Sequence, residues 1–439
     1  MPYIILAIFL SLFSLFLIKP KAGLYLMALL LPLIGFELVF FSLSFPLIDF
    51  VALALLLAFA FKLAFTLLFP SKSTNNLKAP LFFPFFIFLL ASFLSVIFSE
   101  HILYSFWYFC RWPLFLYLAY ILIPYNLIKD QKTLKRLIIS ASISSFIVLI
   151  FGFLSLYGQD WHDSFFRIRS ISLGGVFPFG ENHNLIAEFL NVGAFFILSL
   201  RFLAKDLRIK RFLDFIFVFS VLGIILTFSR SGWLVLFLQA LTYSIIYFHD
   251  RGLKKKDFLF PLILLLLILS PLFLKMNRLQ NDNVSSTENR LLLTEISFEA
   301  FKERPVLGHG SGSFILLVED NLRFRAKYGE AIDSHGILQK VAAENGIFGI
   351  LSWLFILVIL LKVFIQAIKS YSANNPWLTP LILGSLGGLF FQFLNTSYYK
   401  GKVWLPIVLT LLAIKLLDRQ GELANEKKVL VNKNKKNDE

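Results

Sequence analysis

Thirteen apolar runs of about 16 to 24 residues divide this 439-residue sequence. A helix that crosses a bilayer needs about 20 consecutive apolar residues, so each run is long enough to cross once. Hydrophobic residues make up 58% of the chain and charged residues 16%, which is more apolar than an ordinary soluble domain. The pattern predicts an all-α, polytopic membrane bundle with about 12 to 13 transmembrane helices.

The predicted spans are residues 3–18, 22–41, 46–69, 80–98, 104–125, 134–157, 184–203, 211–228, 231–249, 258–274, 346–367, 377–394 and 402–418. Only residues 19–21 separate the first two runs, which leaves the total at twelve or thirteen. No charged side chain precedes the first run, whereas a cleavable signal peptide begins with a basic region. We therefore expect the first run to remain as a membrane helix.

Lysine and arginine cluster in three short loops and in the C-terminal tail, at residues 129–136, 205–211, 251–256 and 419–439. With the predicted spans, all four clusters fall on one side of the membrane, and the positive-inside rule assigns that side to the cytoplasm. The distribution of the net charge of +15 therefore indicates how the chain is oriented in the membrane. We expect membrane lipids around the chain and no nucleic-acid partner.

This orientation leaves two longer segments outside the cytoplasm, and chemistry is expected there. The sequence divides into an N-terminal bundle (1–274, with the short outer segment 158–183), a large helical outer loop (275–345), C-terminal membrane helices (346–418) and a basic cytoplasmic tail (419–439).

The large outer loop begins with a predicted amphipathic helix. Ser285 and Glu288 have the spacing of a capping box, and Pro305 would end the helix after Glu303. Its apolar stripe consists of Leu292, Leu293, Ile296 and Ala300. The glycine-rich residues 308–313 follow, but no GK[ST] motif comes after them, so we expect a flexible turn and not a phosphate cradle.

A second outer helix is predicted to begin at Asp333 or Ser334 and to stop at Gly346. His335 would then lie in its first turn, where the positive end of the helix keeps the imidazole neutral near pH 7. A neutral, accessible histidine can accept a proton. On position alone, a surface histidine without function is an equally good interpretation.

Three arginines require an explanation. Arg111 lies inside the fifth run, where a guanidinium is costly unless it faces a polar cavity or a partner. Arg230 interrupts two runs that no loop separates, and Arg290 lies on the polar face of the first outer helix. A guanidinium binds two phosphate oxygens at once and keeps its charge. All three could therefore converge on one diphosphate.

The start of the seventh run carries Glu181, His183 and Asn184, which are possible substrate contacts. Glu181 and His183 alone make a poor metal site, and the sequence contains no DxD pair to hold a divalent ion against a diphosphate. We therefore expect no metal and no cofactor, with the arginines supplying the positive charge.

Four elements in a fixed order resemble the O-antigen ligase and O-antigen polymerase superfamily of bacterial envelopes. They are the turn 229–233 (SRSGW), residues 289–291 (NRL) leading to 303–310 (ERPVLGHG), residues 333–339 (DSHGILQ) and residues 344–349 (ENGIFG). The resemblance covers residues 180–365, and the remaining spans only by topology. The chain differs from the family in having Gly336 after the histidine and an extra N-terminal span.

The resemblance implies a metal-independent, inverting glycosyltransferase of the GT-C type in the bacterial inner membrane, with its active site facing the periplasm. Its donor would be a glycan linked to undecaprenyl diphosphate. His335 would be essential, Arg230 and Arg290 would bind the donor diphosphate, and Arg111 and Asn184 match further family positions. His335 also fits the independent need for a base that takes the proton of an attacking sugar hydroxyl.

Three functions stay open at this point. An O-antigen ligase would transfer the glycan to lipid A-core, whereas an O-antigen polymerase would join lipid-linked repeat units. We favour the ligase. A secondary transporter is the alternative of another class, but such proteins often show internal repeats, and none is evident here.

Overall fold

The computed structural model describes residues 2–40, 43–69, 77–160, 166–251, 280–395 and 400–437. Its first half contains α1 (Pro2–Ile18), α2 (Pro20–Leu30), β1 (Glu37–Phe40), β2 (Leu43–Pro46), α3 (Leu47–Leu68), α4 (Phe82–Ile97), α5 (Ile102–Phe109), the π-helices η1 (Cys110–Leu114) and η2 (Leu116–Leu122), α6 (Ile123–Leu127), α7 (Gln131–Leu154) and α8 (His183–Leu203). The second half contains α9 (Leu207–Leu226), α10 (Arg230–Arg251), α12 (Gln280–Glu303), α13 (Phe314–Asp320), α14 (Leu322–Tyr328), α15 (Ile337–Tyr371), α16 (Leu378–Phe391) and α17 (Gly401–Asn437).

The prediction of an all-α polytopic membrane protein is confirmed. Within the described ranges, five helical segments are long and apolar enough to cross a bilayer, namely Leu47–Leu68, Ile102–Leu127, Gln131–Leu154, His183–Leu203 and Ile337–Tyr371. Helices α1, α2, α4 and α16 are also apolar but shorter. The predicted span 258–274 lies outside the described residues.

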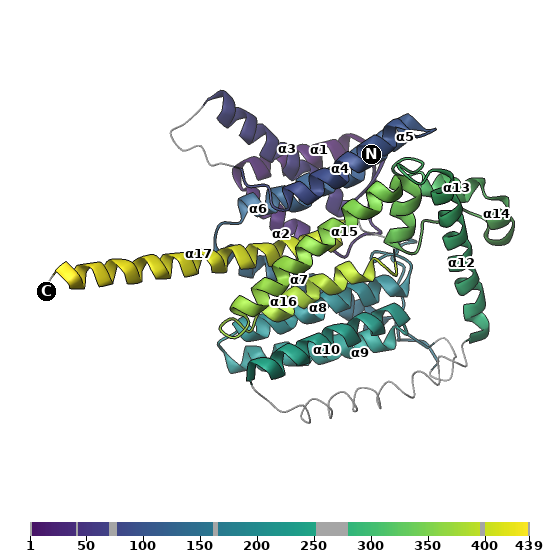
Figure 1. Ribbon diagram of the computed structural model, residues 1–439. Helices are drawn as coiled ribbons and strands as arrows, with labels where there is room; N and C mark the ends of the chain where they lie inside the picture. Colours follow the sequence, from purple (N-terminus) through teal and green to yellow (C-terminus); the bar gives the residue numbers. More distant parts are fainter. Residues whose placement is uncertain are drawn as a thin grey trace.

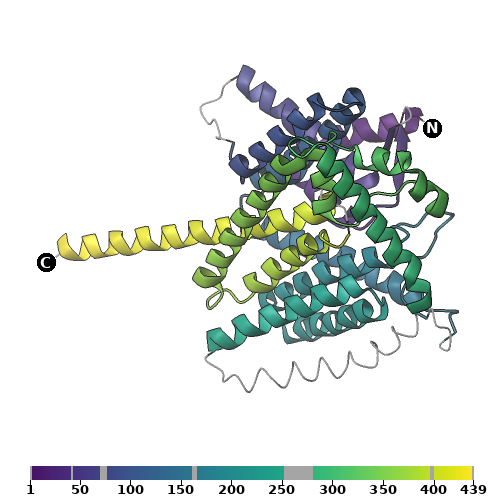
Figure 2. The ribbon, with the colours of Figure 1, turned by 45° about the vertical axis from the view of Figure 1, so that its right-hand side comes forward.

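The helices pack into one bundle with two distinct ends (Figure 1). Helices α8, α9, α10 and α16 lie side by side, and α17 runs between them and the group formed by α1 to α6. Helices α12, α13 and α14 gather with the start of α15 at one end, whereas the C-terminal part of α17 projects from the opposite end (Figures 1 and 2). We call the first of these the site end.

The predicted second span, residues 22–41, is wrong. Helix α2 ends at Leu30, and the chain then forms the antiparallel hairpin of β1 and β2. Pro32 cannot donate the backbone hydrogen bond that would continue the helix, and the N–H of Gly35 donates to the carbonyl of Pro178 at 3.0 Å. The tertiary contact at Gly35 therefore fixes the chain at the site end.

The amphipathic helix of the outer loop ends at Glu303 as predicted, and its apolar stripe is buried. The stripe packs with α13, α14 and α15 in a small core of Leu292, Leu293, Ile296, Ala300, Phe314, Val318, Phe324 and Ala343. The predicted capping box is wrong, because α12 already begins at Gln280. Ser285 lies inside the helix, where the amide groups that a cap would satisfy are bonded within the helix.

Helix α15 is broken at Gly346, whose φ of 61° and ψ of −155° are not helical. The break frees carbonyl groups of the preceding turn, and the glycine-rich turn binds them: the N–H of His309 donates to Ala343 at 2.9 Å and the N–H of Gly310 to Glu344 at 2.9 Å. Gly308 has a φ of 69°, and a Cβ there would lie 2.4 Å from the backbone of Glu344. A side chain at position 308 is therefore excluded both by conformation and by space.

The glycine-rich turn is accordingly not a flexible turn. Ser311 and Ser313 are buried, and the N–H of Phe314 points to the carboxylate of Glu344 at 3.4 Å. The backbone amides of Gly308, His309, Gly310 and Ser313 thus bond to groups of the chain itself. A phosphate cradle needs such amides free to receive an anion, so the turn serves to fix α15 and the residues before it.

Candidate active site

Three elements lie near one another at the site end. They are the turn between α9 and α10, which carries Arg230, the helix α12, which carries Arg290, and the segment before α15, which carries His335. The polar face of α12 is joined to α15 by side-chain contacts: Ser297 Oγ donates to the carbonyl of Gln339 at 2.7 Å, and Gln339 Nε2 donates to Thr294 Oγ1 at 2.6 Å. These bonds hold Arg290 and His335 on neighbouring elements.

The turn that presents Arg230 is short and rigid. Helix α9 ends at Leu226 and α10 begins at Arg230, and Phe228 between them has a φ of 54°. A bulky residue in the left-handed region is strained and needs support. The Ser229 hydroxyl gives part of that support, because it accepts from the N–H of Gly232 at 3.1 Å.

Asn184 connects this turn to α8. Its Oδ1 accepts a hydrogen bond of 2.6 Å from the Ser229 hydroxyl, while its own N–H donates to Asn182, which caps α8. Asn184 thus braces the turn that carries Arg230. A role in substrate contact stays a prediction.

Arg290 is the most clearly unsatisfied cation of the site. The side chain is half-buried, and its Nε is buried with no hydrogen-bond partner among the described residues. Burial, and then the positive charge of Arg230, lower the pKa of the Arg290 guanidinium. Two cations that repel each other and a buried donor that lacks a protein acceptor together form a place where an anion would be stabilised.

His335 is half-buried beside this pair. Burial, and then the charge of Arg290, lower its pKa below the ordinary histidine value, while Asp333 acts in the opposite direction. The ring is therefore neutral near pH 7, as predicted. The predicted cause is wrong, because His335 does not lie in a helix: α15 begins at Ile337, with Gly336 at the capping position and no side-chain cap.

Asp333 and Ser334 fail to cap α15 because other groups engage them. Lys340, whose side chain is 2% exposed, donates to both carboxylate oxygens of Asp333 at 2.6 and 2.7 Å and lies 3.4 Å from Glu344. The Ser334 hydroxyl donates to the carbonyl of Gly336 at 3.0 Å. This network holds the non-helical segment around His335, in which Gly336 has extended backbone angles, next to the start of α15.

Arg111 lies among a different set of side chains. It is part of the π-helix η1, a form of helix often found at functional sites, and its guanidinium lies 4.7 Å from the ring centre of Trp112 and 5.2 Å from that of Phe45. Arg111 also lies near enough to Asp49 and Tyr104 to interact with them electrostatically. Arg230 thus lies near enough to Arg290 for the two charges to interact, whereas Arg111 lies beside the β-hairpin. The charge of Asp333 acts on both His335 and Tyr104.

His183 is the first residue of α8 and is half-buried, whereas Glu181 is exposed. The charges of both Arg290 and Arg167 act on His183. Sequence reasoning missed Arg167, because a single basic residue in an irregular segment carries no periodic signal. Its backbone is fixed on both sides by Gln159, which accepts from its N–H at 3.2 Å and donates to its carbonyl at 3.1 Å.

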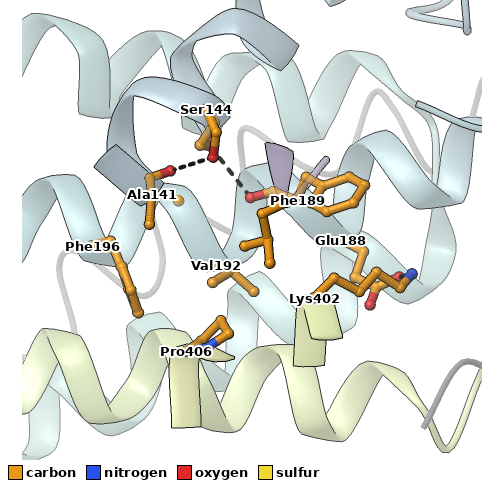
Figure 3. A pocket seen from close by; sticks show the side chains of 11 residues that line it. Ala141, Ser144, Glu188, Phe189, Val192, Phe196, Lys402 and Pro406 are labelled. Carbon is orange, nitrogen blue, oxygen red and sulfur yellow. Dashed lines mark hydrogen bonds and ion pairs between the residues drawn. The ribbon is translucent and has the colours of Figure 1, made fainter. Parts of the chain in front are cut away.

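A buried ion pair links the bundle interior to the His335 segment. Lys402 of α17 donates to Glu188 of α8 at 2.5 Å, with side-chain exposures of 1% and 3%. Gln392 also donates to Glu188, at 2.8 Å, and its carbonyl accepts from the N–H of Ile337 at 3.1 Å. A cavity of about 20 Å³, lined in part by Ser144 and Ser145, adjoins the pair (Figure 3), enough for one water molecule.

Removing one partner of this pair is expected to destabilise the protein strongly. Lys402→Met leaves the Glu188 carboxylate buried and uncompensated, which costs about 3–5 kcal/mol. The double variant Glu188→Gln, Lys402→Met removes both charges and should recover most of that loss. Thermal unfolding in one detergent measures both the loss in the single variant and the recovery in the double variant. Equal melting temperatures for wild type and Lys402→Met would show that the ion pair contributes little to stability.

The arrangement can bind an anion and accept a proton. Arg230 and Arg290 offer fixed positive charge, and the neutral His335 lies close enough for the charge of Arg290 to act on its ring. Within the described part of the chain, no group of three His, Cys, Asp or Glu side chains is placed to hold a metal ion. Metal-independent chemistry stays a prediction.

Comparison with known proteins adds one match. A search of curated proteins gave no match. A protein-family model described as O-antigen ligase matches residues 215–354, a range that contains Arg230, Arg290 and His335. This match confirms the resemblance to the O-antigen ligase and O-antigen polymerase superfamily that the sequence shows.

Proposed function

We propose that the protein is an O-antigen ligase, which transfers a glycan from undecaprenyl diphosphate to lipid A-core. The observation that carries the proposal is the grouping of Arg230, Arg290 and His335 at one end of a membrane bundle, all inside the range of the family match. A lipid-linked donor reaches such a site from the bilayer.

The chemistry follows from the properties of these side chains. The hydroxyl of the acceptor sugar attacks the anomeric carbon and inverts it, and the bond to the diphosphate oxygen breaks. His335 takes the proton of the hydroxyl, for which the neutral ring is required. The electron pair of the broken bond stays on the departing lipid diphosphate, whose charge Arg230 and Arg290 stabilise. Both arginines keep their charge throughout, so no proton has to be supplied to the leaving group.

The site end faces the periplasm in this proposal. The basic loops at 129–136 and 205–211 join helices at the opposite end of the bundle, which the positive-inside rule assigns to the cytoplasm of an inner-membrane protein. We expect an alkaline phosphatase fused after Asn321, between α13 and α14, to be active, because this enzyme requires export. A fusion after Arg251 or Lys205 serves as the control and should be inactive. Activity in the reverse pattern would contradict the orientation and the mechanism.

Lipopolysaccharide from a deletion strain tests the function directly. Loss of the ligase should remove all capped lipid A-core while long polymer accumulates on the lipid carrier. A cap of one repeat unit on lipid A-core would identify the protein as the polymerase instead. Unchanged lipopolysaccharide together with uptake or efflux of a solute would support the transporter alternative.

A further inference from the structure

A buried lysine lies in the first turn of α15, close in sequence to His335. The side chain of Lys340 is 2% exposed, and its ammonium donates to both carboxylate oxygens of Asp333 at 2.6 and 2.7 Å, whereas Glu344 lies farther away, at 3.4 Å. A buried ion pair is often no more stable than apolar side chains of the same size. Neither charge binds the donor in the proposed reaction, so the pair needs a different role.

Charges of opposite sign act on His335. Burial, and then the charge of Arg290 on α12, lower the pKa of His335, whereas Asp333, which precedes it in the same segment, raises that pKa. The end of α16 also packs against this segment, through the uncharged Gln392, whose carbonyl accepts from the N–H of Ile337 at 3.1 Å. Among the described residues, Asp333 is thus the anion whose charge acts on the His335 ring.

The Asp333 carboxylate interacts with titratable groups from several elements. Tyr104 of α5, Glu344 of α15 and Lys400, the residue before α17, all interact with its charge. The Asp333 side chain is 30% exposed, so water also reaches it. Because Lys340 binds both of its oxygens, this lysine fixes the orientation of the carboxylate.

We propose that Asp333 and Lys340 are positioning residues for His335: Lys340 holds the Asp333 carboxylate so that it stabilises the imidazolium formed when His335 takes the proton of the acceptor. The inference rests on the proposed function, because it takes His335 as the base. A nearby carboxylate favours the charged ring, but a carboxylate bonded to the ring would favour it in the resting enzyme as well. Lys340 prevents this by engaging both oxygens. The ring is therefore neutral before the reaction and is stabilised once it has taken the proton.

The protonation of His335 can be measured without turnover. Diethyl pyrocarbonate modifies neutral imidazole, so its rate of reaction at His335 over a range of pH, followed by peptide mass spectrometry of the purified protein, gives the titration midpoint. Asp333→Asn should shift this midpoint downward, because it removes the charge that favours the protonated ring. Lys340→Met should shift it upward, because the carboxylate is released toward the ring. Lys327→Met is the matched control: Lys327 on α14 bonds to Glu288 at 2.5 Å, and its loss should leave the midpoint unchanged.

The double variant tests whether Lys340 acts through Asp333. If it does, the upward shift should disappear once position 333 is asparagine, and Asp333→Asn, Lys340→Met should titrate like Asp333→Asn alone. An upward shift that persists in the double variant would overturn the inference. So would an unchanged midpoint in Asp333→Asn, a result that decides the matter even if Lys340→Met does not fold.

Turnover separates this inference from the proposed function. At pH values above the midpoint, Asp333→Asn should transfer glycan about tenfold more slowly than the wild type, the equivalent of one weakened charged contact, while donor binding persists. A wild-type transfer rate in Asp333→Asn would overturn the inference and leave the proposed function standing. Absence of transfer by the wild-type protein would overturn the proposed function, and with it the catalytic role of the pair.

Discussion

Replacing His335 by alanine is expected to slow glycan transfer by about 10²–10⁴-fold while donor binding persists, because a general base contributes a factor of that size. His335→Gln retains a hydrogen-bonding side chain but cannot accept the proton, so it should be nearly as slow. His101→Gln is the control, since His101 is exposed before α5. Wild-type turnover in His335→Gln would make His335 a positioning residue.

The pH dependence gives a second, independent measurement. Burial and Arg290 lower the pKa of His335, so the neutral fraction increases with pH and is nearly complete above the ordinary pKa of about 6.5. The transfer rate should therefore rise with pH through a value below about 6.5 and then stay level. Arg290→Gln removes a nearby positive charge and should move that midpoint upward. A rate that falls with rising pH would require the protonated ring and would exclude a base.

Replacing Arg230 or Arg290 by lysine is expected to weaken the binding of undecaprenyl diphosphate about 10- to 100-fold, the range that corresponds to one lost charged hydrogen bond. Lysine keeps the charge but cannot form the two parallel bonds of a guanidinium. Binding should be measured directly with the purified protein in detergent. Arg323→Lys is the control, because Arg323 lies in the same outer region, is 72% exposed and bonds to Glu295 at 3.1 Å.

The double variant tests whether both arginines contact one ligand. If they share a diphosphate, the losses of the two single variants should not add, because the remaining arginine rearranges on the same group. Additive losses would place them on separate anions. Unaltered binding in both single variants would move the diphosphate site elsewhere, and Arg111, which lies near Asp49 and Tyr104, would then be the next position to examine.

Much of the architecture could be predicted because it depends on local signals. The apolar runs located the bundle helices from α3 to α10 to within a few residues, since a bilayer demands continuous apolar length. The stripe on α12 was recognisable from its helical spacing. The hairpin after α2 could not be predicted in the same way, because its sequence is as apolar as a membrane helix and the contact of Gly35 with Pro178 decides the outcome.

The candidate site residues likewise divide into those that local sequence signals identified and those that only the tertiary structure revealed. Arg230, Arg290 and His335 could be proposed as site residues from the sequence, because a charge or a histidine in such surroundings requires a reason. That Arg230 lies near Arg290 and that Arg111 lies beside the hairpin could not be read from residue types, because η1, α10 and α12 are distant in sequence and only helix packing brings side chains together. Arg167 could not be identified from the sequence, because its position depends on tertiary contacts. Gln159 bonds to both its N–H and its carbonyl.

The sequence by itself determined the class of protein, the approximate bounds of the helices from α3 to α10, the buried stripe of α12 and the residue types available for catalysis, because these depend on composition and on neighbours within a few turns. The tertiary structure alone decided that Asp333 bonds to Lys340 in place of capping α15, that the glycine-rich turn binds the broken end of α15, and that Gln392 joins Glu188 across 204 residues of sequence. The physical reason is that a buried polar group must find a partner, and which partner it finds depends on how separate helices pack.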